Sequence, residues 1–249
     1  MKLFCGDCLQ QMNHLAPRSV DLVLSDLPYG TTQCKWDSII PLIPLWKGIL
    51  RILKPAGAVV LTSAQPFTSI LVCSNLKMFR YDCVWVKDRA TGHLNAGRSP
   101  MRRHESILVF AHRREKITFN PQLIAGAAST AIGAFRGYGG HKNKASQIYG
   151  VAGGHKSKQW NAKINPHSVL YFNSVPSRPI RLHPTQKPVD LARYLIRTYS
   201  NSGDVVLDVA MGSGSFGEAA LLEDRGFIGI EKDQAIFDIA CNRLKTFQN

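Results

Sequence analysis

The stretch from Gly203 to Asp233 constrains the fold more than any other part of the chain. "GDVVLDVA" has the apolar run of a buried strand, "GSFGEAALLEDRG" begins on glycines and continues as a helix, and "FIGIEKD" is a second strand. This order predicts a βαβ unit with parallel strands, and "QAIFDIACNRLKTF" predicts an amphipathic helix after it. Residues 1–111 alternate between strand-like and helix-like segments in the same way, so we expect one mainly parallel sheet.

A glycine pattern marks the turn inside this unit. Gly212, Gly214 and Gly217 follow G-x-G-x-x-G, and Glu231 stands where an acid can accept both hydroxyls of a ribose. The spacing predicts a site for an adenosine-containing cofactor, with a tight turn that binds no ligand as the alternative. A nicotinamide dinucleotide fits poorly, because Asp208 beside the loop would repel its pyrophosphate. The cationic S-adenosylmethionine suits an acid there.

The second chemical feature is "VDLVLSDLPYG", a strand that ends in an acid, a proline and an aromatic ring. An exocyclic amine of a base is a poor nucleophile, because its lone pair is delocalised into the ring. The Asp26 carboxylate and a backbone carbonyl at Leu27 or Pro28 could hold the amino hydrogens, and the Tyr29 ring could stack on the base. The alternative is an ordinary turn, since Asp, Pro and Gly are common turn residues.

The charge distribution favours an anionic partner. The formal net charge is +14, and the segment from Lys116 to Val189 holds ten Lys and Arg residues but neither Asp nor Glu. Cations interleaved with aromatic and polar residues predict a nucleic-acid contact segment, with a disordered basic insertion as the alternative. The expected phosphate contacts in it are Lys142, Lys144, Lys156 and Lys158.

Other classes of protein are disfavoured. The sequence has neither an apolar run of 18 residues nor the apolar region of a signal peptide, so we expect a cytoplasmic protein with no membrane partner. Cys5 and Cys8 form a single C-x-x-C, and the histidines show no ligand spacing. We therefore expect free thiols in a reducing cytosol and no metal.

Several motifs together resemble one family. "SDLPYG", "DVAMGSGSFG", "HPTQKPVDLARYLI", "FIGIEKD" and "GDCLQQM" are similar to motifs of the permuted, beta-class amino-DNA methyltransferases, which modify adenine N6 or cytosine N4. "SDLPYG" corresponds to the catalytic D-P-P-Y tetrad, with Leu27 in place of the first proline. In the glycine loop, Val209 and Ala210 replace the usual Pro-Phe. The motif order, with catalytic half, recognition region and cofactor half in turn, is that of the beta class.

The resemblance implies a fold and a domain organisation. The fold would be a doubly wound α/β, Rossmann-like methyltransferase with a mostly parallel, seven-stranded sheet and a basic insertion. Residues 1–111 would form the catalytic half, 112–181 the target-recognition segment, and 182–249 the cofactor-binding half.

The resemblance also assigns residues and a reaction. The target-amine site would consist of Asp26, Pro28 and Tyr29. Cofactor-binding residues would be Asp7, His183, Thr185, Lys187, Asp208, Gly212, Ser213, Gly214 and Glu231. The partner would be DNA, with the target base flipped out of the duplex. Adenine N6 is favoured because an Asp opens the tetrad, where N4 enzymes more often have Ser; cytosine N4 stays the alternative.

Some residues and functions remain open at this stage. His104 and Glu105 are interpreted as structural, and Trp36 and Asp37 either gate the target base or pack under it. RNA or protein-glutamine methylation is the first rival, although those enzymes usually begin the tetrad with Asn. A DNA-binding module without chemistry is the second. The sequence leaves open the recognition site, a restriction partner and a homodimer.

Overall fold

The computed structural model describes residues 1–30, 38–112, 115–125, 163–176 and 186–247. The chain forms two compact units, Met1–Asn120 with Ser168–Asn249, and Pro121–His167. In the second unit, the described residues include an antiparallel pair, β6 (Ile124–Ala125) and β7 (Lys163–Ile164).

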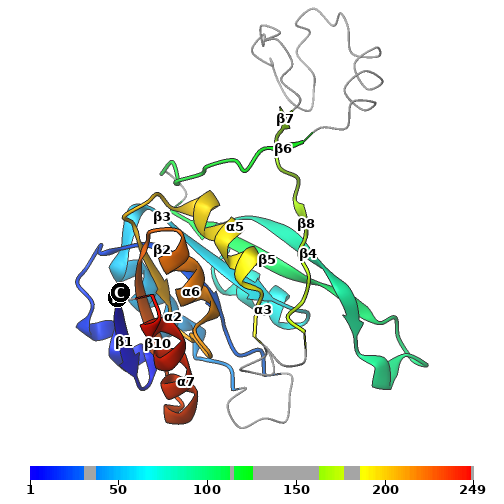
Figure 1. Cartoon of the computed structure of the whole chain (residues 1–249), viewed down its shortest axis with the longest axis horizontal. Helices are drawn as coiled ribbons and strands as arrows, with labels where there is room; N and C mark the ends of the chain where they lie inside the picture. The colour runs from blue at the N-terminus through cyan, green and yellow to red at the C-terminus, as the bar shows by residue number, and fades with distance from the viewer. Residues whose placement is uncertain (31–37, 113–114, 126–162, 177–185, 248–249) are drawn as a thin grey trace, which may run out of the picture. The chain divides into compact units, whose positions relative to one another are not determined.

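The first unit is built on a twisted sheet with the strand order β1-β10-β9-β2-β3-β5-β4-β8 (Figure 1). Its strands are β1 (Lys2–Cys5), β2 (Val20–Asp26), β3 (Leu53–Ser63), β4 (Phe79–Thr91), β5 (Arg102–Ala111), β8 (Val169–Tyr171), β9 (Val205–Asp208) and β10 (Gly226–Glu231). Only the pairs of β5 with β3 and with β4 are antiparallel. The expected doubly wound, mostly parallel α/β fold is confirmed.

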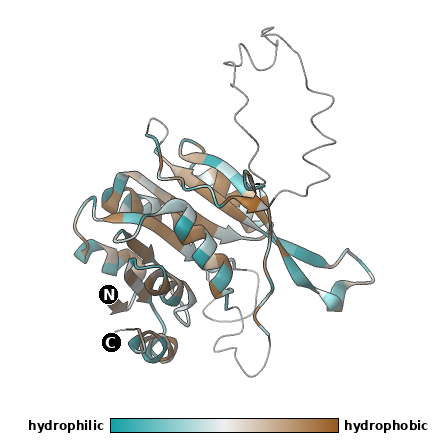
Figure 2. Cartoon of the chain, turned by 45° about the horizontal axis from the view of Figure 1, so that its top comes forward, coloured by the Kyte–Doolittle hydropathy of each residue, from teal (hydrophilic) through white to brown (hydrophobic). Residues whose placement is uncertain are grey.

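Helices cover both faces of this sheet. They are α1 (Cys8–Gln11), α2 (Leu42–Ile52), α3 (Phe67–Ser74), α5 (Val189–Tyr199), α6 (Ser215–Leu222) and α7 (Gln234–Lys245), with 3₁₀ turns η1 (Met12–His14) and η2 (His93–Asn95). Successive strand residues face opposite sides, so Val23 packs in the core with α1, α2 and α3, whereas Leu22 and Leu24 pack with α5, α6 and α7. Figure 2 shows the resulting apolar interior.

The described sheet has eight strands, not the expected seven. The additional strand is β8, which pairs in parallel with β4, so that Val169 lies opposite Val84. Its Leu170 is buried, and the indole of Trp85 donates to the carbonyl of Phe172 at 2.8 Å. Neighbour contacts hold this three-residue strand, because its apolar run, residues 169–172, is short.

The unit boundaries also differ from the expected recognition segment 112–181. Residues 115–120 and 168–176 belong to the first unit. The side-chain amide of Asn120 donates to the carbonyls of Arg197 and Ser200, at 3.1 and 3.0 Å, which fixes this edge to α5. The recognition role of the segment stays a prediction.

The hairpin of β4 and β5 is longer than the apolar runs of the sequence predict. Those runs cover residues 82–87 and 106–112, but the paired strands continue outward to Thr91 and Arg102. Figure 1 shows this ribbon extending from the sheet, and Figure 2 shows that its outer part is hydrophilic. Within the described residues, no helix has the length and apolar character needed to cross a membrane.

Candidate active site

A large cavity lies where the order of the sheet reverses. β9 and β2 are neighbours, with β10 on the outer side of β9 and β3 on the outer side of β2. In such sheets, ligands bind beyond the carboxyl ends of the strands at this switch point. A cavity of about 890 Å³ lies there, and its lining includes Asp26, Asp208 and Glu231, each the last residue of its strand. A smaller cavity of about 420 Å³, beside α5, contains none of these carboxylates.

The glycine loop between β9 and α6 has the geometry that its sequence predicts. Gly212 and Gly214 have φ values of +52° and +79°, which side-chain-bearing residues rarely adopt. A Cβ at Gly217 would lie 2.6 Å from the Phe227 ring, so this glycine lets α6 pack closely on β10. A Cβ at Gly212 would meet no described atom within 4 Å, because the loop borders the open cavity.

Glu231 ties this loop to the end of β10. Its Oε2 accepts from the backbone N–H of Gly212, and its Oε1 accepts from that of Asp233, both at 2.9 Å. Each carboxylate oxygen can accept more than one hydrogen bond, so the side chain retains acceptor capacity toward the cavity that it lines.

Asp208 joins the two halves of the chain. Its Oδ1 accepts from the Ser25 hydroxyl at 2.6 Å and from the Ala210 N–H at 3.1 Å. Burial raises the pKa of Asp208 to about 7, and these two hydrogen bonds offset only part of that effect. Near neutral pH the carboxyl group is therefore poised between its two protonation states.

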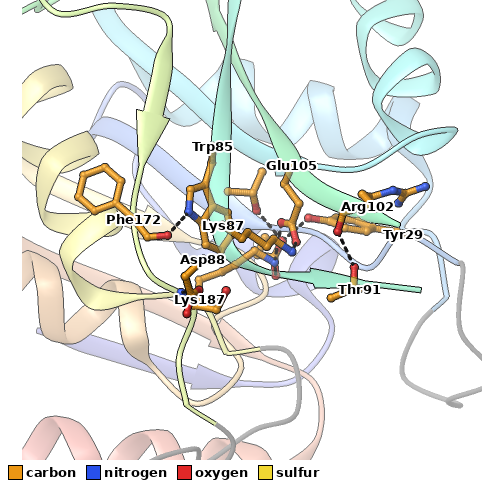
Figure 3. A network of polar contacts seen from close by, with 12 residues as sticks. Tyr29, Trp85, Lys87, Asp88, Thr91, Arg102, Glu105, Phe172 and Lys187 are labelled. Atoms are coloured by element: carbon orange, nitrogen blue, oxygen red, sulfur yellow. Dashed lines mark hydrogen bonds and ion pairs between the residues drawn. The ribbon is translucent and has the colours of Figure 1, made fainter. Parts of the chain in front are cut away.

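Asp26 is the centre of a network of buried charges, of which Figure 3 labels Lys187, Glu105 and Lys87. Its Oδ1 accepts from the hydroxyls of Tyr29 and Thr62, and its Oδ2 accepts from the Lys187 ammonium at 2.5 Å. The side chain of Lys187 is 7% exposed and that of Asp26 is 21% exposed. The carboxylate is thus fixed in orientation while it still lines the cavity.

Glu105 and Lys87 complete this charge network, which we call the Asp26 network: Asp26, Lys187, Glu105 and Lys87. The Lys187 ammonium lies 3.4 Å from Glu105 Oε2, and Lys87 donates to Glu105 Oε1. Burial alone would raise the pKa of Glu105, but the two lysines outweigh it and the pKa lies below its ordinary value. Burial would lower the pKa of Lys187, but Asp26 and Glu105 raise it above its ordinary value. Glu105 and Lys187 therefore both carry charge at neutral pH.

Tyr29 is held on several sides. Its hydroxyl donates to Asp26 at 2.6 Å, and its ring stacks on Phe67 with centroids 5.5 Å apart and planes at 29°. The Lys187 ammonium lies 5.5 Å from the ring centroid. Burial and the neighbouring Asp26 carboxylate raise the pKa of Tyr29 well above its ordinary value, so the phenol stays neutral and acts as a donor. Stacking of this ring on a target base stays a prediction.

The structure brings together most of the residues that the sequence singled out. The cavity lining includes Asp7, Asp26, Pro28, Tyr29, Lys187, Asp208, Gly212, Ser213 and Glu231. Gly214 caps α6 behind it, and Asp7 caps α1 by accepting from the Leu9 N–H at 2.9 Å. Lys187 contacts Asp26 and Tyr29, the residues expected at the target amine. Outside the described residues lie Trp36, Asp37, Lys142, Lys144, Lys156, Lys158, His183 and Thr185.

Sequence reasoning missed three residues of this site. Thr62 and Lys87 received no role, and Glu105 was interpreted as structural, yet Glu105 and Lys87 line the cavity and Thr62 bonds to Asp26. The sequence does contain a signal for the contact between Lys87 and Glu105. The two residues have opposite charges and lie at the ends of adjacent apolar runs, which a hairpin would bring together.

The fold and the site define a nucleotide-cofactor enzyme of the doubly wound α/β class, with an acid–proline–tyrosine loop beside its glycine loop. The family model N6_N4_Mtase, described as DNA methylase, matches residues 20–242, and the chain belongs to this family.

Individual proteins agree with this assignment over nearly the whole chain. The Type II methyltransferase M.HpaI of Haemophilus parainfluenzae is 26% identical, over 98% of this chain and 74% of its own length. The DNA adenine methyltransferase YhdJ of Escherichia coli K12 is 29% identical, over 96% of this chain and 81% of its own. The crystal structure of an M1.HpyAVI–SAM complex superposes with a TM-score of 0.65 at 22% identity, covering 98% and 99% of the two chains.

Proposed function

We propose that this chain transfers a methyl group from S-adenosylmethionine to the N6 amino group of adenine in DNA. The observation that carries the proposal is the shared cavity, in which the buried Asp26 carboxylate lies beside the glycine loop and Glu231. Family membership and the similarity to the adenine methyltransferase YhdJ support the same reaction.

The glycine-loop side of the cavity fits this cofactor. Asp7, Asp208 and Glu231 line it, so its carboxylates suit a ligand with cationic groups and ribose hydroxyls. The open space beside Gly212 lets a ligand approach the backbone. In this assignment Glu231 holds the ribose, Asp208 faces the methionine part, and Asp7 lies at the adenine end. When bound, S-adenosylmethionine supplies an electrophilic methyl group on a sulfonium.

The residues around Asp26 then prepare the acceptor amine. Asp26 accepts one amino hydrogen, and the backbone carbonyl of Leu27 or Pro28 accepts the other, which draws nitrogen toward tetrahedral geometry. As the nitrogen lone pair forms the new N–C bond, the S–C bond of the donor would break and its electron pair would stay on sulfur as a neutral thioether. The Asp26 carboxylate stabilises the positive charge that develops on nitrogen until nitrogen releases a proton to water. Lys187, Thr62 and Tyr29 hold the carboxylate in place by donating hydrogen bonds to its two oxygens.

Cytosine N4 is the second candidate, because the family includes both chemistries. Asp26 at the start of the tetrad supports adenine. The presence of Asp26, Tyr29 and Glu231 argues against a DNA-binding module without chemistry. We place the reaction in the cytoplasm, where DNA and the methyl donor are both available.

Tritium transfer from labelled S-adenosylmethionine to DNA, RNA and protein tests the proposal. We expect label in DNA alone, and single-molecule sequencing of DNA from cells expressing the chain should show N6-methyladenine at one motif. N4-methylcytosine would overturn the adenine assignment. Label in RNA or protein alone would overturn the substrate class, and label in none of the three would overturn the enzyme.

A further inference from the structure

The outer part of the β4–β5 hairpin, residues 88–104, is exposed along its whole length. We call it the arm. Regular pairing of the two strands continues to Val86 and His104, then shifts in register before Thr91 pairs with Arg102. Gly92, with φ +91°, and η2 follow β4. Figure 1 shows the arm reaching beyond the helices that cover the sheet. An exposed ribbon of this kind adds little to the core, so its composition must be explained by something outside the fold.

The composition of the arm is strongly cationic. Its charged residues are Arg89, Arg98, Arg102, Arg103 and one acid, Asp88, and its histidines are His93 and His104. The acid is already engaged, because Asp88 Oδ1 accepts from the Ser174 N–H at 2.7 Å and Asp88 Oδ2 lies 3.6 Å from Arg89 Nε. Four arginines against one aspartate leave three positive charges in excess.

The described residues provide no carboxylate partner for three of these arginines. Within the part of the chain that the structure describes, Arg98, Arg102 and Arg103 form no ion pair. Among the described residues, Arg102 and Arg103 donate to the backbone carbonyls of Gln65 and Lys87. Like charges on a thin ribbon repel each other in the free protein, and a polyanion would remove that repulsion.

An apolar side chain stands in η2, beyond the paired strands. Leu94 is 88% exposed, between His93 and Asn95. A single exposed leucine is ordinary on a protein surface. Here it lies on a projecting ribbon that also carries Arg89 and Arg98, and apolar side chains on such cationic elements can insert between base steps.

The arm also borders the cavity that contains Asp26. Arg89, Ala90, Thr91 and His93 belong to the lining of that cavity. A base that reaches Asp26 therefore has the arm beside it, and the duplex that the base leaves must lie close to the arm. Figure 3 shows the Thr91 hydroxyl donating to the Arg102 carbonyl, which ties the two strands of the arm together beside the cavity that Thr91 lines.

We propose that the arm binds duplex DNA beside the target base, with Arg98, Arg102 and Arg103 on phosphates and Leu94 against the base step that the flipped base vacates. This inference rests on the proposed function, because it takes DNA as the substrate. It assigns DNA binding to described residues outside the acid-free segment where the sequence predicts it.

The first experiment measures the charge contribution of the arm. The variant R98Q/R102Q/R103Q is titrated with a mixed-sequence duplex by fluorescence anisotropy over a range of salt. Three lost phosphate contacts should flatten the log–log salt slope by about 2.7 and weaken binding on the order of 100-fold at 0.1 M salt. The lysine variant R98K/R102K/R103K should keep the wild-type slope.

The matched control removes three charges elsewhere. Lys2, Lys47 and Lys77 are exposed and do not line the cavity. The variant K2Q/K47Q/K77Q should keep the wild-type slope. A wild-type slope in the arm variant would overturn the inference. An equal loss in the control would overturn it as well, because the effect would then follow net charge and not the arm.

The second experiment tests Leu94. The variant L94S is bound to a duplex that carries 2-aminopurine at the target position, with the site taken from single-molecule sequencing. Its fluorescence rise on binding should be about tenfold smaller than that of the wild type, with an unchanged salt slope. A mismatch opposite the target should restore the rise, because a mispaired base flips at lower cost. A wild-type rise on the matched duplex would exclude the wedge.

Failure of this inference can be distinguished from failure of the proposed function. If the wild type methylates DNA and the arm variants bind DNA like the wild type, only the arm is misassigned. If the wild type methylates nothing but the arm variants lose duplex binding, the arm is correct and the proposed reaction is wrong.

Discussion

The Asp26 network and the arm hold their charges in opposite ways, although both depend on the β4–β5 hairpin. In the network, Asp26 and Glu105 face Lys187 and Lys87, and the four side chains are between 7% and 21% exposed. In the arm, arginines outnumber acids and every residue is exposed. Buried charges must be paired because desolvation is costly, whereas exposed charges can remain unpaired until a ligand arrives.

The change from paired, buried charges to exposed charges occurs between two consecutive residues of the hairpin. Lys87 is half-buried and pairs with Glu105, whereas Asp88 is exposed and begins the arm. The two regions should respond differently to salt, because screening is strong between exposed charges and weak between buried ones. We therefore expect ionic strength to change DNA affinity much more than the rate of methyl transfer in the bound complex.

Removing one cation from the network should have the largest effect. Lys187→Gln leaves Asp26 and Glu105 buried with only Lys87 as a counter-ion, and breaking a buried pair costs about 3–5 kcal/mol of unfolding free energy. Denaturant unfolding measures this loss. Lys77→Gln, at an exposed position, is the control and should change stability by less than about 0.5 kcal/mol.

The unfolding free energy that Lys187→Gln loses should depend on pH in a direction that the two pKa shifts define. The pKa of Glu105 is depressed, so its stabilising contribution is present above its ordinary pKa of 4.5 and disappears as pH falls through the folded value. The pKa of Lys187 is raised, so its contribution is present below its ordinary pKa of 10.5 and disappears above the folded value. The difference between wild type and Lys187→Gln should therefore be greatest between these limits and shrink in acid. A difference that does not vary with pH would contradict the network.

Removing the Asp26 carboxylate, the partner of Lys187, should slow methyl transfer without weakening the binding of donor or DNA. Asp26→Ala should transfer methyl at least about a hundredfold more slowly, because an interaction made chiefly in the transition state is lost. Single-turnover kinetics measure the rate, and titrations should show near wild-type affinity for donor and DNA. Asp26→Asn keeps one acceptor oxygen and should retain more activity than Asp26→Ala. A near wild-type rate for Asp26→Ala would mean that the loop is only a turn.

The glycine-loop side of the cavity should respond in cofactor affinity alone. Glu231→Ala should weaken S-adenosylmethionine binding by about 1–3 kcal/mol, the scale for a lost charge-assisted hydrogen bond. Calorimetry measures this, with Glu223→Ala as the control, since Glu223 pairs with Arg193 and Arg197 and none of the three lines this cavity. DNA affinity and its salt slope should not change. Wild-type cofactor affinity would show that the Glu231 assignment is wrong.

Parts of the fold and of the site that depend on nearby residues could be predicted from the sequence, whereas parts that depend on distant residues could not. The glycine loop, Asp208 and Glu231 follow from local spacing, because a βαβ unit fixes their positions within about thirty residues of chain. The contact of Lys187 with Asp26 joins residues 161 positions apart, and such a pairing is not contained in a local pattern. β8 and the arm were missed for a related reason. The apolar run of β8 is very short and the arm lacks apolar alternation, so pairing with neighbouring strands gives both their conformation.

Asp208 should give the smallest change in ligand affinity of the predicted effects. Its buried environment also differs most clearly from the paired charges of the Asp26 network. It is a buried carboxyl for which the described residues provide no ion pair, and burial raises its pKa to about 7, whereas the lysines depress that of Glu105. Because its folded pKa is raised, the stability that it contributes is present below its ordinary pKa of 3.8 and is lost as pH rises through about 7. Burial thus favours the protonated form of Asp208, whereas a cationic ligand beside it would favour the ionised form.

S-adenosylmethionine affinity should therefore rise by about tenfold between about pH 5.5 and pH 7, and binding in this range should release a proton. Calorimetry in buffers of different ionisation enthalpy measures both quantities. Asp208→Asn should flatten the dependence, because the amide does not titrate. S-adenosylhomocysteine should show a weaker dependence, since it lacks the sulfonium charge but keeps the ammonium. If both ligands gave the wild type the same steep pH dependence, Asp208 would be facing the ammonium and not the sulfonium, and the placement of the reacting methyl group beside this carboxylate would have to be revised.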